Sequence, residues 1–179
     1  MCHGEPRRRL GALATDTRGT AAIEFSLIAG FVIFALFNTI DFARYFWQKM
    51  EFENATQMAA QAAWKTCDTT HLPATTNCPG LNAAVTAAIH SSSLGSSVTL
   101  ANGSPTEGYY CVNASSALVY VSDVSSKPAN CSSVGNASGL PGDYIKVQTT
   151  YTFTPLFSGI SLGSTLTSPI IDTSIMRLQ

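Results

Sequence analysis

Charged side chains are scarce in this sequence. Only 12% of the 179 residues are Asp, Glu, Lys or Arg, and the formal net charge is −1. A nucleic-acid-binding domain carries a clustered excess of Lys and Arg, whereas the basic residues after residue 40 are scattered. We therefore expect no nucleic-acid partner. The apolar content of 45% excludes a disordered chain and fits a membrane-tethered globular unit.

The sequence also lacks the usual signatures of catalysis. It has three histidines, of which His71 and His90 are the two that follow the long apolar run. No Gly-x-Ser-x-Gly elbow occurs, and no phosphate-binding Gly-rich loop lies between a strand and a helix. Serine is abundant, but a serine becomes a nucleophile only beside an activating base. We expect no enzyme, no catalytic residue and no cofactor.

Glycine and proline are absent from residues 32 to 71, so no helix breaker interrupts this stretch. The pattern predicts one continuous helix from about Thr20 to about Lys65, roughly 70 Å long at 1.5 Å per residue. Residues 20–40 are apolar and would rise roughly 30 Å, which matches the hydrocarbon core of a bilayer. Residues 41–66 would continue the helix outside the membrane. Small and apolar side chains there recur with helical spacing, at Phe52, Ala55, Ala59 and Ala62.

Residues 1–19 form a basic leader before the apolar run. Four of the ten basic residues belong to it: Arg7, Arg8, Arg9 and Arg18. The positive-inside tendency predicts that the leader stays in the cytoplasm and that the rest is exported. A cleaved signal peptide is the alternative, but the nearest Ala-x-Ala, at residues 60–62, lies about twenty residues too late. Aromatic residues at the predicted membrane exit are typical of an interface belt, with a ligand-binding patch as the alternative; they are Phe42, Tyr45, Phe46 and Trp47.

Residues 67–179 read as a small α+β domain. A short second helix is predicted over Leu81–Ser92 from its helical spacing. Alternation of apolar and polar residues from Ile145 to Phe153 predicts the clearest strand. Weaker strands are predicted at Ser97–Ala101, Tyr109–Asn113, Ala117–Ser122 and Ile170–Leu178. We expect a meandering antiparallel sheet packed on the continuation of the long helix, because this arrangement buries both apolar faces. The exposed loops 68–80 and 124–142 are candidates for partner contact.

The five cysteines are Cys2, Cys67, Cys78, Cys111 and Cys131. Removal of the leader would leave four cysteines, all in the part of the chain that is predicted to be exported to an oxidising compartment, where disulfides persist. Three pairings are possible. Cys67 with Cys78 and Cys111 with Cys131 is favoured because both bonds close local loops. A metal site is the alternative, with Cys67, His71, Cys78 and His90 as ligands, but this spacing matches no standard zinc pattern.

Glu24 is a lone carboxylate at the start of the apolar run. A carboxylate inside a span costs a few kcal/mol by insertion scales and marks function by default. The alternative is that Glu24 has no function and lies at the membrane interface, where the helix dipole stabilises a negative charge in the first turn. A cut after Gly19 would create a protonated α-amino group at Thr20, with which the Glu24 of a neighbouring subunit could pair. Gly19 suits a cut site because it has no side chain to block a protease.

The run Gly19-Thr-Ala-Ala-Ile-Glu24-Phe25 resembles the Gly, four residues, Glu, aromatic motif of the Flp/Tad branch of type IV pilins. Its extension to residue 64 is similar to the TadE-like pseudopilins. The resemblance implies that a membrane-embedded prepilin peptidase cuts between Gly19 and Thr20, and that Glu24 and Phe25 serve processing and assembly. The product would be a minor pilin of the tight-adherence system. Its partners would be other pilins, the Tad machinery and membrane lipid.

Two features of the chain favour a TadE-type or TadF-type subunit over a major pilin. Phe25 stands where major Flp pilins usually have Tyr, and the chain is longer by a hundred-odd residues. A different class of protein stays open at this stage. It is an unprocessed single-pass membrane protein that displays a periplasmic binding domain.

Overall fold

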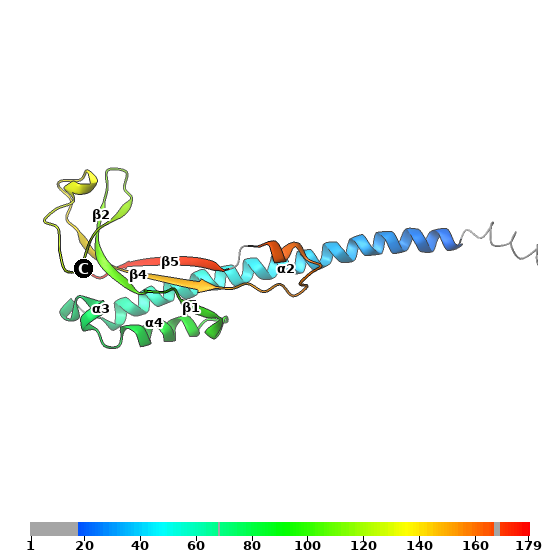
Figure 1. Cartoon of the computed structure of the whole chain (residues 1–179), viewed down its shortest axis with the longest axis horizontal. Helices are drawn as coiled ribbons and strands as arrows, with labels where there is room; N and C mark the ends of the chain where they lie inside the picture. The colour runs from blue at the N-terminus through cyan, green and yellow to red at the C-terminus, as the bar shows by residue number, and fades with distance from the viewer. Residues whose placement is uncertain (1–17, 68, 167–168) are drawn as a thin grey trace, which may run out of the picture.

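The computed structural model describes residues 18–67, 69–166 and 169–179. One long helix, α2 (Arg18–Thr66), runs from one end of the molecule to the other, and a small domain packs along its C-terminal half (Figure 1). The predicted continuous helix is confirmed. It is uninterrupted because no proline within it breaks the backbone hydrogen bonds. Cys2 and the arginines at residues 7–9 lie outside the described residues.

The C-terminal half of α2 is buried on two sides, by α4 (Leu81–His90) and by the sheet (Figure 1). Its fully buried side chains are Phe52, Ala55, Thr56, Ala59, Ala60 and Ala63. Small residues let both layers approach the helix closely. The prediction of Ala62 in this stripe is wrong: Ala62 is half-buried, and Ala60 and Ala63 take its place. A helix covered on two sides needs a wider buried stripe than one apolar face supplies.

Short elements make up the rest of the chain. The helical ones are η1 (Thr69–His71), α3 (Ala74–Asn77), α4, η2 (Gly95–Ser97), η3 (Ser132–Val134) and η4 (Leu162–Thr165). The strands are β1 (Val98–Leu100), β2 (Thr106–Val112), β3 (Leu118–Asp123), β4 (Gly142–Tyr151) and β5 (Ile170–Arg177). The second helix and all five strands occur where the sequence predicts them. The fold is α+β, with a long apolar N-terminal helix followed by a small antiparallel sheet domain.

Strand β4 is the centre of the sheet. β5 pairs antiparallel with one edge of β4, over Tyr144–Tyr151. β1 and β2 pair with different halves of the other edge, and β3 pairs with β2. The predicted meander is therefore wrong in its order, since β3 and β4 are not neighbours. The ten-residue β4 is long enough to hold two short strands end to end along one edge.

The predicted alternation along β4 is confirmed. Ile145, Val147, Thr149 and Tyr151 are buried, and the residues between them are half-buried. The hydroxyl groups of Thr149 and Thr56 share a hydrogen bond between β4 and α2. The Thr56 hydroxyl is also 3.0 Å from the carbonyl oxygen of Phe52. The sheet therefore contacts α2 through both apolar packing and a paired polar group.

Two disulfides close local loops. Cys67 at the end of α2 is bonded to Cys78 after α3, and Cys111 of β2 is bonded to Cys131 before η3. This is the pairing that the sequence favours. Because Cys67 and Cys78 are bonded to each other, the alternative metal site of Cys67, His71, Cys78 and His90 loses two of its four ligands.

Candidate membrane and assembly segment

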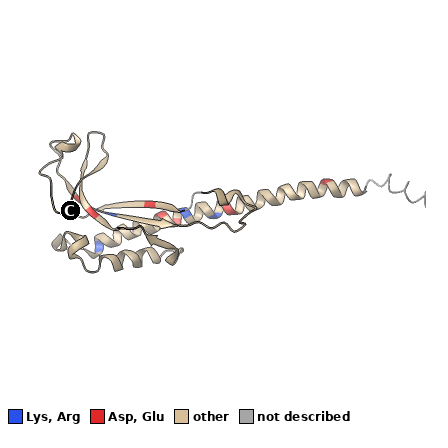
Figure 2. Ribbon diagram, viewed as in Figure 1, with Lys and Arg blue, Asp and Glu red and all other residues tan. Residues whose placement is uncertain are grey.

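Residues 19–36 of α2, which we call its free half, extend beyond the domain, and almost all of their side chains are exposed (Figure 1). Its large apolar side chains are exposed, among them Ile23, Phe25, Leu27, Ile28 and Phe31. Glu24 is the one charged residue from residue 19 to residue 40, and Figure 2 shows a single acidic residue on this part of the ribbon. Such a surface needs lipid or protein to cover it. Among the described residues, α2 is the helix that is long and apolar enough to cross a membrane.

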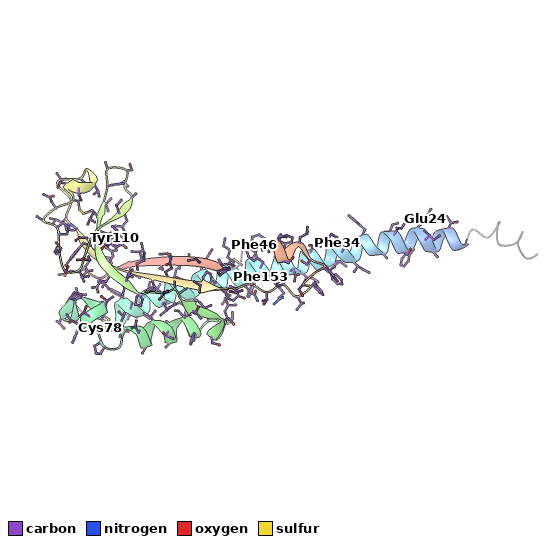
Figure 3. The ribbon with its side chains drawn as sticks, viewed as in Figure 1. Glu24, Phe34, Phe46, Cys78, Tyr110 and Phe153 are labelled. Atoms are coloured by element: carbon purple, nitrogen blue, oxygen red, sulfur yellow. A yellow bond between two sulfur atoms is a disulfide. The ribbon has the colours of Figure 1, made fainter. Side chains whose placement is uncertain are left out.

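Glu24 lies on this free half, near the end of α2 that is remote from the sheet (Figure 3). Its side chain is exposed, and no described residue forms a hydrogen bond or an ion pair with it. The neighbouring Ser26 hydroxyl instead donates to the carbonyl oxygen of Ile23, at 2.8 Å. Within the described part of the chain, the carboxylate has no compensating charge.

Gly19 and Thr20 lie in the first turn of α2, and both are exposed. A Cβ added to Gly19 would meet nothing within 4 Å. The described fold therefore has no steric need for glycine at this position. Phe25 lies one residue after Glu24, with its ring exposed. The cut between Gly19 and Thr20, and the roles of Glu24 and Phe25, stay predictions.

The C-terminal part of the chain returns to α2 at the end of the domain nearest to the free half of the helix. Residues 155–166, which we call the anchor loop, connect β4 to β5 and contain η4. The backbone amides of Leu156 and Phe157 donate to the two carboxylate oxygens of Asp41, at 2.8 and 3.3 Å. The amide of Leu162 donates to Oδ1 of Asn38, at 2.8 Å. Asp41 is completely buried by these contacts.

Ring contacts continue this attachment along α2. The ring of Phe157 stacks on Phe37 with centroids 4.2 Å apart, so the anchor loop reaches a residue inside the predicted span. Tyr45 packs edge-on against Phe153, while Phe46 and Trp47 are exposed. Tyr45 thus belongs to the domain packing, and the interface belt stays a prediction for the other aromatic residues.

Sequence reasoning missed the anchor loop. Asp41 is the first charged residue after the apolar run, and nothing local links it to a segment more than a hundred residues away. The lack of charge in residues 147–171 does not single the loop out either, because residues 69–106 form a longer stretch without Asp, Glu, Lys or Arg.

The first predicted contact loop is held more tightly than its composition indicates. Glu107 of β2 accepts hydrogen bonds from the backbone amides of Ala74 and Thr75, at 2.8 and 2.7 Å. This carboxylate satisfies free amides at the start of α3 and fixes the 69–80 segment to the sheet. Together with the Cys67–Cys78 disulfide, it leaves this segment little freedom to adapt to a partner.

Asp143, at the start of β4, lies beside the second predicted contact loop. Its side chain is buried, and Oδ1 has no hydrogen-bond partner among the described residues. Burial raises the pKa of this carboxyl to about 6, and the nearby Glu107 carboxylate adds to the rise, while Lys127 opposes it. The group is a source of pH-dependent stability.

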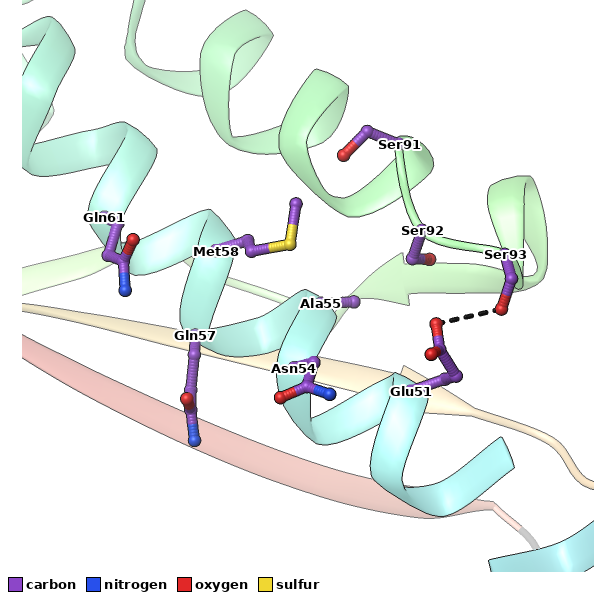
Figure 4. A pocket seen from close by; sticks show the side chains of 9 residues that line it. All are labelled: Glu51, Asn54, Ala55, Gln57, Met58, Gln61, Ser91, Ser92 and Ser93. Atoms are coloured by element: carbon purple, nitrogen blue, oxygen red, sulfur yellow. Dashed lines mark hydrogen bonds between the residues drawn. The ribbon is translucent and has the colours of Figure 1, made fainter. Parts of the chain in front are cut away.

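An open groove of about 450 Å³ lies between α2 and the end of α4 (Figure 4). Polar side chains line most of it, including Asn54, Gln61 and Ser91. The Ser93 hydroxyl donates to Glu51 across its end, at 2.9 Å (Figure 4). The groove offers amide and hydroxyl groups on the face of α2 that the sheet leaves uncovered.

No curated protein matches the chain. No solved structure matches it either. A family model does match, and its position coincides with the segment that carries the Gly19 to Phe25 motif. The model is described as TadE-like protein and covers residues 19–61, so along most of α2 this chain is similar to TadE-like proteins.

Proposed function

We propose that the chain is a processed minor pilin, a TadE-like pseudopilin that takes part in assembling or priming a Flp/Tad-type pilus for adhesion. One observation carries the proposal. Glu24 is an exposed carboxylate with no partner among the described residues, it lies on the free apolar half of α2, and it follows Gly19 by five residues within the TadE-like segment. A charge on a surface that must be covered favours a partner with the opposite charge.

In this proposal the chain crosses the bacterial inner membrane once. The basic leader of residues 1–19 stays in the cytoplasm, residues 20–40 span the bilayer, and residues 41–66 continue the helix into the periplasm. The domain of residues 67–179 follows there. Its two disulfides support this placement, since the periplasm is an oxidising compartment. The mature subunit would then enter the pilus or its membrane assembly complex.

A prepilin peptidase removes the leader between Gly19 and Thr20 in this mechanism. The new α-amino group of Thr20 carries a positive charge near neutral pH. It pairs with the Glu24 carboxylate of a neighbouring pilin as the free halves of two helices pack together. Each charge then lowers the free-energy cost of burying the other in an apolar contact. Lateral packing also covers the exposed rings of Phe25 and Phe31.

The test replaces Glu24 in cells that make the pilus. Glu24→Ala should still be cut after Gly19 but should give few pili, because the partner's amine would be left unpaired in an apolar contact. Glu53→Ala is a matched control, since it removes the same side chain from a half-buried site farther along α2, where it pairs with Lys49 at 3.8 Å. Pili are counted by electron microscopy and by recovery of sheared fibres. Normal piliation with Glu24→Ala would overturn the pairing mechanism.

A further inference from the structure

The anchor loop presents three large apolar side chains away from the protein. Leu156, Ile160 and Leu162 are 59%, 54% and 55% exposed. These side chains belong to a segment with a defined position, because three hydrogen bonds join the backbone of the loop to Asp41 and Asn38. The fold therefore holds these side chains outward in a defined position.

The level of the loop along α2 is set by its contacts. The Leu162 amide bonds to Asn38, and Phe157 stacks on Phe37, and both partners lie inside the span of residues 20–40. At 1.5 Å per residue, Asn38 lies roughly 3 Å inside the outer edge of a span that ends at residue 40. Figure 1 shows η4 lying on α2 next to the free half of the helix.

The chemistry of the loop suits the boundary between hydrocarbon and headgroups. The chain carries no charged residue from 147 to 171, so inserting the loop does not bury a charge. The one carboxylate beneath it, Asp41, already accepts hydrogen bonds from two backbone amides. The exposed apolar side chains are continuous with the apolar surface of α2, which itself needs a cover.

We propose that the anchor loop is a membrane-interface element that inserts Leu156, Ile160 and Leu162 into the outer edge of the same bilayer that α2 crosses. Its occupant is lipid, at the depth of the glycerol groups and upper acyl chains. The loop fixes how deep the domain sits, because Asp41 joins it to the helix. Extraction of the subunit would then have to remove both α2 and the loop from lipid. The inference rests on the membrane-spanning role of α2 proposed above.

The test uses the full chain in phosphatidylcholine vesicles, with Cys2→Ser to leave no unpaired native thiol. Single cysteines at Ile160→Cys, Leu140→Cys and Phe31→Cys receive an environment-sensitive fluorophore. Leu140 is the matched control, because it is an exposed apolar residue on a distal loop. Quenching is measured with aqueous iodide and with two nitroxide lipids, one labelled high on the acyl chain, at the expected depth of Ile160, and one labelled near the chain end, at the expected depth of Phe31. Leu140 also corrects for the fraction of chains that face inward.

We expect iodide to quench the label at Ile160 about fivefold less than the label at Leu140, and the nitroxide high on the acyl chain to quench it strongly. Equal iodide quenching at Ile160 and Leu140 would overturn the proposal. So would protection of Ile160 from both quenchers, which would mean that protein, such as a second copy of the chain, covers the loop. The label at Phe31 keeps the two proposals separate. If lipid quenches Phe31 but not Ile160, α2 spans and the loop does not insert. If the lipid nitroxides quench neither label, the proposal that α2 spans the bilayer is wrong.

Discussion

Asp143→Asn should stabilise the domain, and by an amount that depends on pH. The Asp143 carboxyl is buried beside Glu107, and its pKa rises from 3.8 to about 6 in the folded chain. The folded state therefore holds this proton more tightly than the unfolded state. The stability that the folded protein gains from this tighter proton binding is fully present below about pH 4 and is lost as the pH rises through about 6. Moving the pKa from 3.8 to about 6 corresponds to on the order of 3 kcal/mol.

An asparagine imitates the protonated carboxyl and cannot lose its proton. Asp143→Asn should match the wild type near about pH 4 and exceed its free energy of unfolding by on the order of 2–3 kcal/mol near about pH 8. The assay is urea unfolding of the full chain in a mild detergent, followed by tryptophan fluorescence at both pH values. Asp172→Asn is the control, because it removes the same charge from a half-buried site on β5. A stabilisation of equal size at both pH values, or none at all, would refute the reasoning.

Three further sets of substitutions test the packing of the domain in the same unfolding assay. Thr56→Val leaves the buried Thr149 hydroxyl without its partner and should lower the free energy of unfolding by about 1–3 kcal/mol. The double variant with Thr149→Val should recover most of this loss, because neither hydroxyl is then left unpaired. A double variant that is less stable than the sum of the two single effects would contradict this. Replacing Cys111 and Cys131 together by alanine opens a loop of sequence separation 20 and should cost about 3 kcal/mol, and an unchanged urea midpoint would count against it. Gly108→Ala should destabilise by about 1–3 kcal/mol, because the new Cβ would lie 2.8 Å from a backbone oxygen of β3, and wild-type stability would show that the hairpin shifts freely.

Local patterns in the sequence account for most of the elements. The absence of glycine and proline predicts the length of α2, and alternation predicts β4 with its buried residues. The short spacing of the cysteines favours the observed disulfides. Each of these features depends on residues that are near one another in the chain, so spacing alone carries the information.

The parts that the sequence could not predict depend on contacts between distant residues. Pairing of β1 and β2 with one edge of β4 follows from the relative lengths of three strands and leaves no local mark. The attachment of the anchor loop to Asp41 is similar, because the loop has neither helical nor strand periodicity. Asp143 shows a further limit, since only the fold reveals that its carboxylate is buried beside Glu107. Burial of a polar group is a property of the tertiary structure.

The proposed processing of the chain has a direct test in the mass and N-terminal sequence of the mature protein. The chain is produced together with an active Tad-type prepilin peptidase and, separately, with an inactive form of that enzyme. We predict a product that begins at Thr20 with the active enzyme and an intact leader with the inactive one. A chain that keeps Arg18 and Gly19 in the presence of the active enzyme would contradict the proposal and would favour an unprocessed membrane protein.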